Sequence, residues 1–521
     1  MREKYETLAL VDLRAIAKSR GIKGTSSMKK EDVINAMVEL DEKEKRESIG
    51  NEPVKKAVVK KQTNTKVVVN GTQELDKDNT RSAEPDKEEK QSKPQTTEQE
   101  KPKAAQQSKP QTAEQEKTKS ADEQQNAQNA EQAARDKEKE SVINELDSGV
   151  LAKGILEIMP DGFGFIRSEN YLPGENDVYV APSQIRRFGM KTGDIVAGNT
   201  RIKSAAEKFS ALLYVKSING YPPEVAAKRP NFEDMTPIFP DEKLKLETAG
   251  APVAMRIMDV ISPVGKGQRG MIVSPPKAGK TTLLKNVAQS VLKNNPEIHL
   301  IILLIDERPE EVTDIKEAIC GDNVEVIYST FDELPEHHKR VAEMVMERAK
   351  RLVEHKQDVM ILLDSITRLT RAYNLTVPPS GRTLSGGLDP AALHMPKKFF
   401  GAARNMREGG SLTVLATALV DTGSKMDDVV YEEFKGTGNM EMVLDRKLSE
   451  RRVFPAIDIP KSGTRREDLL LTAEEIEAVN MMRRAFNGMK GDEAVDRVIE
   501  LFTHTKNNVE FVHMMKKMRI V

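Results

Sequence analysis

The residues Gly270-Met-Ile-Val-Ser-Pro-Pro-Lys-Ala-Gly-Lys-Thr-Thr282 fix the architecture of this chain. They predict an apolar strand, a tight turn and a helix whose apolar positions follow at helical spacing: Leu283, Leu284, Val287, Ala288, Val291 and Leu292. A phosphate-binding loop has this context, because backbone N–H groups at the helix start hold β and γ phosphates. In such a loop Lys280 reaches the phosphate oxygens and the Thr281 hydroxyl ligates Mg²⁺. Ser274 stands at the first glycine of the pattern G-x-x-x-x-G-K-[ST], so a strand-turn-helix without nucleotide is the alternative for this stretch alone.

Two further apolar runs end in carboxylates. Val359-Met-Ile-Leu-Leu-Asp364 closes on an aspartate suited to Mg²⁺ bound through water, and Leu300-Ile-Ile-Leu-Leu-Ile305 continues into Asp306-Glu307-Arg308. Because parallel strands end at one edge of a sheet, these carboxylates are expected to face the phosphate loop, where a general base can orient the attacking water. The three strand ends predict a nucleotide-hydrolysing α/β domain; an α/β domain that binds no nucleotide is the alternative.

Length and composition set the outer bounds. The 521 residues allow two or three domains, and a net charge of −1, from 81 basic and 82 acidic residues, favours neither a nucleic-acid nor a membrane partner. Cys320 is the only cysteine, which excludes a disulfide framework and fits a reducing compartment. The start lacks the apolar core of a signal peptide, and the apolar runs have strand length. We expect a cytoplasmic protein with no membrane partner.

The first part of the chain divides in two. Residues 1–42 contain two stripes of apolar residues at helical spacing, which predict a helical module. The first stripe is Leu8, Leu10, Leu13 and Ile16, and the second is Val33, Ile34, Met37 and Val38. The module is either nucleic-acid-associated or a plain docking cap. Residues 43–145 are polar and low in complexity, and Gln91–Lys103 recurs almost unchanged as Gln107–Lys119. Such a segment cannot bury enough apolar surface to offset chain entropy, so we expect a disordered insertion. A solvated spacer is the simplest role, and nucleic-acid contact or condensation is left open.

Residues 146–221 predict a small OB-type, cold-shock-like β-barrel. Five short turn-bounded strands are expected at Val150–Leu156, Gly162–Arg167, Asp177–Val180, Asp194–Asn199 and Ser210–Ser217. Period-two spacing puts Phe163, Phe165 and Arg167 on one face, where two exposed rings and a guanidinium would stack single-stranded bases at ~1–3 kcal/mol per base. The alternative is that this face is the barrel core. Other residues can supply that core instead: Ile155, Ile158, Ile166 and Val180.

A proline-rich linker is predicted at 222–245, before the nucleotide domain at 246–521. Two Gly-containing loops follow Asp364, each with one cation, Arg382 or Lys425, suited to a phosphodiester backbone; ordinary surface loops are the alternative. Arginines at two later turns, Arg451-Arg452 and Arg465-Arg466, are candidates for a finger that reaches a γ-phosphate across a subunit boundary.

These motifs together resemble the Rho family of bacterial transcription termination factors. The resemblance covers the barrel and residues 236–517, and it rests on long motifs: P-P-K-A-G-K-T (275–281), I-D-E-R-P-E-E-V-T (305–313), L-L-D-S-I-T-R-L-T-R-A-Y-N (362–374), F-F-G-A-A-R-N (399–405), D-T-G-S-K-M (421–426), E-E-F-K-G-T-G-N-M-E (432–441) and R-V-F-P-A-I-D (452–458). It implies a homohexameric ring with a RecA-type motor domain that uses ATP and Mg²⁺. Such a ring translocates 5′ to 3′ on C-rich single-stranded RNA and dissociates the RNA polymerase elongation complex.

The resemblance also assigns roles in the nucleotide site. The phosphate loop is formed by Pro276, Lys277, Ala278, Gly279, Lys280, Thr281 and Thr282. Lys277 and Lys280 contact phosphates, Thr281 and Asp364 hold Mg²⁺, and Glu307 is the base for water. Arg465 is the finger from the adjacent subunit, with Arg452 and Arg308 as γ-phosphate or interface partners, and Phe454 stacks on adenine.

On the RNA side, the resemblance assigns a primary, pyrimidine-preferring site to Phe163, Phe165, Arg167, Tyr179, Glu207 and Phe209, and a channel site to Arg382, Thr422 and Lys425. Arg382 stands where many relatives have lysine, so its RNA contact is in question. Phe209 stands where tyrosine is commoner, so a hydroxyl contact there is in question while stacking is kept. Two other classes stay open: an RNA-independent RecA-type or rotary-type ATPase, and a non-enzymatic RNA-binding condensate protein.

Overall fold

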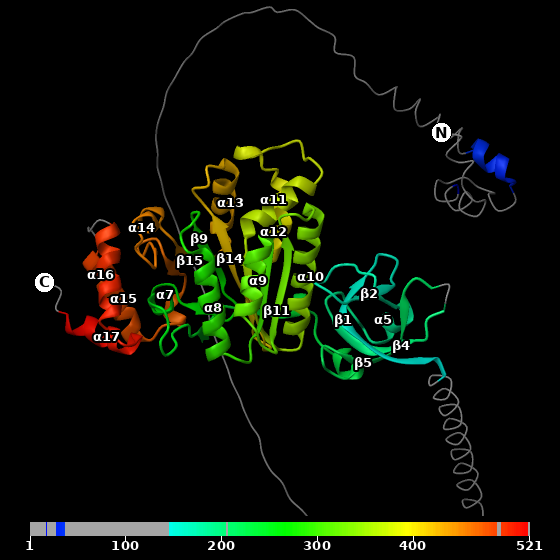
Figure 1. Ribbon diagram of the computed structural model, residues 1–521, viewed down its shortest axis with the longest axis horizontal. Helices are drawn as coiled ribbons and strands as arrows, with labels where there is room; N and C mark the ends of the chain where they lie inside the picture. Colours follow the sequence, from blue (N-terminus) through cyan, green and yellow to red (C-terminus); the bar gives the residue numbers. More distant parts are fainter. Residues whose placement is uncertain (1–16, 18–27, 37–144, 205–206, 487–490, 519–521) are drawn as a thin grey trace, which may run out of the picture. The chain divides into compact units, whose positions relative to one another are not determined.

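The computed structural model describes residues 17, 28–36, 145–204, 207–486 and 491–518 (Figure 1). Residues 1–108 and 109–521 form two separate units. In the first unit, residues 30–36 are helical, and Val33 and Ile34 are buried. The rest of the predicted helical module and the predicted insertion up to residue 144 lie outside the described residues. Across the described ranges, every helix is too short or too polar to cross a membrane.

The predicted barrel is present and closed. Its strands are β1 (Asp147–Ile158), β2 (Gly164–Arg167), β3 (Val178–Val180), β4 (Ile195–Arg201) and β5 (Ser210–Ile218), in the order β1-β2-β3-β5-β4, and α5 (Pro182–Arg187) follows β3. The alternation of β2 explains its two faces, because Ile166 is buried with Leu156 and Val180 whereas Phe165 points away from that core. Gly164 faces inward as well, where a Cβ atom would lie 2.8 Å from Leu156 Cδ1. The expectation that apolar residues other than the phenylalanines form the core is confirmed for Ile166 and Val180, with Ile158 packed against them. It is wrong for Ile155, which is buried instead in the core that includes α10 (Pro335–Glu354), because the barrel packs against that helix.

The second domain is built on a largely parallel sheet. Its main path is β11 (Val324–Thr330), β10 (His299–Glu307), β12 (Asp358–Asp364), β14 (Ser411–Leu419), β9 (Arg269–Ser274), β15 (Met440–Val443) and β16 (Gly463–Thr464), with β13 (Arg404–Met406) and β6 (Pro237–Ile238) off this path. From β11 to β15 every pairing on this path is parallel, whereas β16 pairs antiparallel with β15. The predicted strands at 270–273, 300–305, 359–364 and 412–419 are therefore confirmed as neighbours that end at one edge.

Helices cover both faces of this sheet, which makes the predicted α/β class correct (Figure 1). One core joins the sheet to α7 (Val253–Ile261), α8 (Lys280–Asn294), α9 (Pro309–Ala318), α14 (Arg446–Glu450), α15 (Ala473–Phe486), α16 (Gly491–Thr503) and α17 (Asn508–Lys517). The other joins it to α10 (Pro335–Glu354), α11 (Ile366–Thr376), α12 (His394–Gly401) and α13 (Lys425–Lys435). Successive residues of β10 alternate between the two cores, Leu300 in the first and Ile301 in the second, so its continuous apolar run is typical of a strand buried on both faces. The short 3₁₀ turns are η1 (Phe232–Asp234), η2 (Ser385–Gly387), η3 (Pro390–Leu393) and η4 (Glu467–Leu469).

The segment predicted as a linker, residues 222–245, carries short elements of its own. These are α6 (Pro223–Ala226), η1, β6 and β7 (Lys243–Leu244); β6 pairs with β13, and β7 pairs with β8 (Val264–Gly265). Within this segment, the buried side chain of Arg229 donates to Asp194 of the barrel at 2.7 Å and to Glu354 of α10 at 2.8 Å. The segment therefore packs against the nucleotide domain and contributes to the junction with the barrel.

Candidate nucleotide and RNA sites

The phosphate loop runs from the end of β9 at Ser274 to the start of α8 at Lys280. Lys277 and Gly279 both have left-handed backbone, with φ of 65° and 92°, so the loop turns sharply just before the helix N-terminus. Ser274 is the buried last residue of β9, and its Oγ donates to the Pro275 carbonyl oxygen at 2.9 Å. A side chain is accommodated at this position, so the missing first glycine does not count against the loop.

Lys280 joins the carboxylates of the two neighbouring strand ends. Its Nζ lies 2.6 Å from Asp364 Oδ1 and 2.8 Å from Glu307 Oε1. Burial alone lowers the pKa of Lys280, but the charges of Asp364 and Glu307 outweigh it and raise that pKa above its usual value. Burial likewise opposes ionisation of Glu307, but Lys280 and Arg368 lower its pKa overall. Lys280 and Glu307 are therefore both charged at neutral pH, as phosphate chemistry requires.

Two charged residues that sequence reasoning missed complete this pocket of about 520 Å³. Arg368, in the first turn of α11, places Nη1 3.2 Å from Glu307 Oε2. Glu311, in the first turn of α9, lines the same pocket, and burial together with the charge of Glu307 raises its pKa. Both residues lie within one helical turn of a strand end, and this spacing was a signal that could have found them. The predicted Arg308 and Thr281 also line this pocket.

An apolar pocket of about 540 Å³ adjoins the phosphate loop. Phe454 lines it together with loop residues Lys277, Gly279 and Thr282, and a Cβ atom on Gly279 would lie 3.9 Å from the Phe454 ring. The Phe454 side chain is 49% exposed, so its ring is available for stacking. The fold thus brings the predicted adenine-stacking ring to the predicted phosphate loop.

The other predicted arginines lie elsewhere in the chain. Arg465 lines a separate pocket of about 650 Å³ with Arg466, Arg483, Lys435 and Lys461, and no phosphate-loop residue lines that pocket. Arg452 is exposed in a turn, with a φ of 63°. Within one chain, the structure therefore places Arg308 in the phosphate pocket but neither Arg465 nor Arg452.

Four aromatic rings gather on one face of the barrel. Phe165 packs edge to face against Phe163 at 5.7 Å, Tyr179 at 6.1 Å and Phe209 at 5.1 Å between ring centroids. The pocket beside Phe165, of about 440 Å³, is also lined by Tyr179, Phe209, the predicted Glu207, and two cations missed from the sequence, Arg201 and Lys208. All four predicted rings are thus brought together, and they are half-buried against one another.

Arg167 does not lie exposed beside these rings, contrary to the sequence expectation. It is buried, its guanidinium lies 4.8 Å from the Phe165 centroid, and it pairs with Asp177 and with Glu157, the latter at 2.7 Å. Two carboxylates draw the guanidinium inward, which is the physical reason for the difference. Asp177 was missed, although it directly precedes β3, the strand that pairs with β2; its buried Oδ1 has no hydrogen-bond partner among the described residues.

The two Gly-containing loops are packed against each other. Gly386 lies so close to the other loop that a Cβ atom there would be 2.4 Å from the Met426 backbone nitrogen. Arg382 and Lys425 are both exposed, and Lys425 is the first residue of α13. The predicted Thr422 lines the phosphate pocket and donates to Asp427 at 2.6 Å. One short loop therefore reaches the phosphate pocket at Thr422 and presents a cation at Lys425.

These features define a class: an ATPase with a RecA-type motor domain that carries an OB-type nucleic-acid-binding barrel. Residues 152–224 match the Rho termination factor RNA-binding domain, 254–464 the nucleotide-binding domain of the ATP synthase alpha/beta family, and 4–40 the Rho termination factor N-terminal domain. Transcription termination factor Rho of Aquifex aeolicus (strain VF5) is 56% identical over 370 residues, which are 70% of this chain and 85% of that protein. The protein of the same name from Bacillus subtilis (strain 168) is 57% identical over 366 residues, 70% of this chain and 84% of its own length. The chain belongs to the transcription termination factor Rho family.

Proposed function

We propose that this protein is an ATP-dependent RNA translocase and helicase, which binds C-rich single-stranded nascent RNA and terminates transcription by dissociating the RNA polymerase elongation complex. One observation carries the proposal: a chain with an aromatic, cation-flanked barrel face also holds Lys280, Glu307 and Asp364 together at the ends of parallel strands. Its place of action would be the cytoplasm, where bacterial transcripts are made. Residues 146–221 would hold the RNA, and residues 246–521 would form the motor.

The nucleotide would be ATP with Mg²⁺. Thr281 and Asp364 supply hard oxygen donors, which Mg²⁺ prefers, and phosphate oxygens and water would complete its coordination. Among the described residues, no group of three or more His, Cys, Asp or Glu could hold a metal alone, which suits an ion that arrives with the nucleotide. When bound, Mg²⁺ would neutralise charge that develops on the transferred phosphoryl group.

The acid–base chemistry would fall to Glu307. The Lys280 ammonium donates hydrogen bonds to both Glu307 and Asp364. When a nucleotide binds, its more negative phosphates would draw the ammonium away from these carboxylates. Glu307 would then keep Arg368 as a partner and have one oxygen free to orient the attacking water. Glu311, with its raised pKa, is a second carboxylate in the same pocket.

The distance of Arg465 from the phosphate loop supports an assembly of several subunits. The pocket around Arg465 is lined by four other cations and by three carboxylates, Glu441, Glu467 and Asp468. Its excess of positive charge would suit the γ-phosphate of an adjacent subunit in a homohexameric ring. Each hydrolysis event would then lie between subunits, beside the loop that carries Thr422 and Lys425. Movement of that loop would displace RNA in the channel.

Steady-state ATP hydrolysis with poly(C), poly(A), DNA or no nucleic acid tests this function. Strong stimulation by poly(C) alone is expected. Hydrolysis that ignores RNA would instead favour an RNA-independent RecA-type or rotary-type ATPase, and the absence of ATP binding would favour a non-enzymatic RNA-binding protein.

A further inference from the structure

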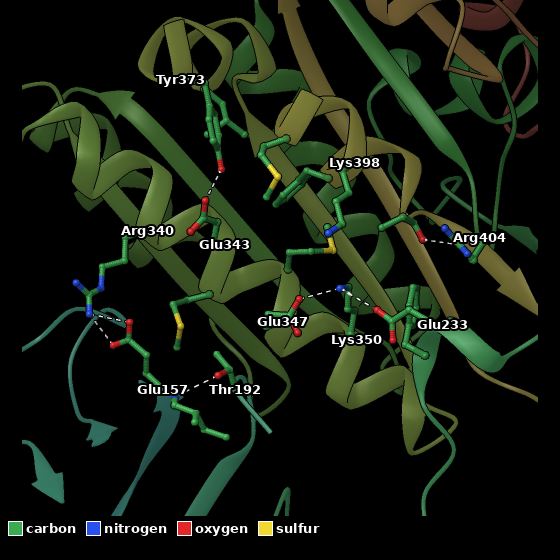
Figure 2. A pocket seen from close by; sticks show the side chains of 18 residues that line it. Glu157, Thr192, Glu233, Arg340, Glu343, Glu347, Lys350, Tyr373, Lys398 and Arg404 are labelled. Atoms are coloured by element: carbon green, nitrogen blue, oxygen red, sulfur yellow. Dashed lines mark hydrogen bonds and ion pairs between the residues drawn. The ribbon is translucent and has the colours of Figure 1, made fainter. Parts of the chain in front are cut away.

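One carboxylate is shared between the barrel's RNA face and the motor domain. Glu157, on β1, accepts a hydrogen bond at Oε2 from Arg167 Nε at 2.7 Å, and Arg167 Nη2 forms an ion pair with the same oxygen, also at 2.7 Å. Arg340, on α10, donates Nη2 to both oxygens of the same carboxylate, each at 2.7 Å, as Figure 2 shows. The Glu157 side chain is 15% exposed and that of Arg167 only 6%, so water screens this pair weakly, whereas the Arg340 side chain is 35% exposed.

The two arginines compete for Glu157. Oε2 serves both of them, whereas Oε1 is bound by Arg340 alone. An arginine and a carboxylate bind most strongly through two parallel bonds, one to each oxygen. Arg340 therefore prevents Glu157 from closing this two-bond pair on Arg167, and it also offsets the carboxylate charge. Arg340 Nε is buried without a hydrogen-bond partner among the described residues, so the guanidinium itself is incompletely bound.

Helix α10 is also joined to α11, the helix whose first turn carries Arg368 of the phosphate pocket. Glu343 follows Arg340 by three residues, so both lie on one side of α10. Glu343 Oε1 accepts the Tyr373 hydroxyl at 2.8 Å, which joins α10 to α11 (Figure 2). The first turn of α11 carries Arg368, which pairs with Glu307. Helices α10 and α11 thus connect the ion pairs beside the RNA face to Arg368, the partner of the proposed catalytic base.

We propose that Arg340 is a positioning residue that couples RNA on the barrel to nucleotide in the motor. RNA that stacks on Phe165 shifts the Arg167 guanidinium, which lies 4.8 Å from the centroid of that ring, and so weakens its hold on Glu157. Glu157 then binds Arg340 more firmly and draws α10 toward the barrel. Through Glu343 and Tyr373 this shift reaches α11 and Arg368. Coupling is reciprocal, so nucleotide in the motor alters the affinity of the barrel for RNA. The inference rests on the proposed function and adds a residue to it.

Binding of labelled oligo(C) to the full-length protein, with and without a nonhydrolysable ATP analogue, tests the coupling. In the wild type the analogue is expected to change the RNA Kd by roughly fivefold or more. Arg340→Gln should bring the ratio of the two RNA Kd values, without and with the analogue, close to one. It should also weaken the stimulation of ATP hydrolysis by poly(C), while hydrolysis without RNA is unchanged. Arg340→Lys, which keeps the charge but not the fork, should restore part of the ratio. The double variant with Glu157→Gln and Arg340→Gln should reduce this Kd ratio no further than the more affected single variant does, because both substitutions break the same contact.

Lys191→Gln is the matched control. Lys191 also bridges the barrel and α10, with Nζ 3.0 Å from Glu354, but it has no link to Arg167. This variant should keep the wild-type ratio, and equal melting temperatures would show that each variant folds. The inference is overturned if Arg340→Gln keeps the wild-type ratio, or if Lys191→Gln loses as much. A wild type that hydrolyses ATP without regard to RNA would instead overturn the proposed function, and the inference with it.

Discussion

The RNA face of the barrel and the phosphate pocket of the motor are built in opposite ways. The four rings of the barrel face come from a short stretch, residues 163–209, and they hold one another by edge-to-face contacts. The phosphate pocket draws charged groups from three strand ends far apart in the chain, and the parallel sheet sets their spacing. Stacking tolerates variation in base and ring position, whereas charge stabilisation requires groups fixed in advance. All four rings of the barrel face come together within one chain, whereas Arg465, the proposed finger, does not line the phosphate pocket of its own chain, so a pocket that needs it would be incomplete there.

The largest expected effect tests this incompleteness. Arg465→Ala should lower ATP turnover by roughly 10³-fold or more, the range of an arginine finger, and leave oligo(C) binding to the barrel unchanged. Mixing Arg465→Ala subunits with Lys280→Ala subunits should restore part of the hydrolysis, because some interfaces then combine an intact Lys280 with an intact Arg465. No recovery on mixing, with both variants confirmed in the same rings, would mean that the site is not shared between subunits.

Removing the proposed base should separate binding from chemistry inside the phosphate pocket. Glu307→Gln keeps the size of the side chain but removes its charge, so ATP binding should be largely intact while turnover falls by roughly 10²-fold to 10⁴-fold. Glu310→Gln and Glu311→Gln, measured singly beside it, would show which carboxylate of this segment orients water. Unchanged steady-state hydrolysis in Glu307→Gln would refute its assignment.

A ring substitution should affect only the barrel. Phe165 contacts the other three rings of the barrel face. Phe165→Ala should therefore weaken oligo(C) binding by about 1–3 kcal/mol without lowering ATP affinity. Filter binding for RNA and calorimetry for ATP would measure the two separately. An equal loss of both affinities would indicate misfolding and remove the contrast between the two regions.

The same contrast explains what the sequence could predict. Gly270–Thr282 and the apolar runs ending at Ile305 and Asp364 are local patterns, so the strands, the phosphate loop and their common edge followed from them. Period-two spacing predicted Phe163 and Phe165 on one face, whereas Tyr179 and Phe209 were assigned by the resemblance to the Rho family. Ion partners did not follow from such local patterns, because Glu157 and Arg340 are 183 residues apart and meet only when the barrel packs against α10. Arg167 was expected to be exposed because strand periodicity gives the face of a side chain but not its ion partners; Glu157 and Asp177, each ten residues away, bury it.

The junction between the two regions should respond to acid, with the smallest effect of the four. His355 stacks on Tyr221 at 4.4 Å, and burial, together with the charge of Arg229, lowers its pKa to about 4, although Asp194 and Glu354 oppose this. Between this pKa and the ordinary value of 6.5, the unfolded chain binds a proton at His355 that the folded chain does not. This contribution to stability is therefore complete above pH 6.5 and is lost as the pH falls toward 4.

His355→Phe keeps a ring against Tyr221 and removes the titrating group. Its melting temperature should fall less than that of the wild type between pH 7 and pH 4.5, by a few degrees at most, because every other acid-sensitive group is common to both proteins. Melting curves at matched ionic strength would measure the difference. Parallel declines in the two proteins would mean that His355 is not held neutral at the junction, and that acid acts on the barrel and the motor separately.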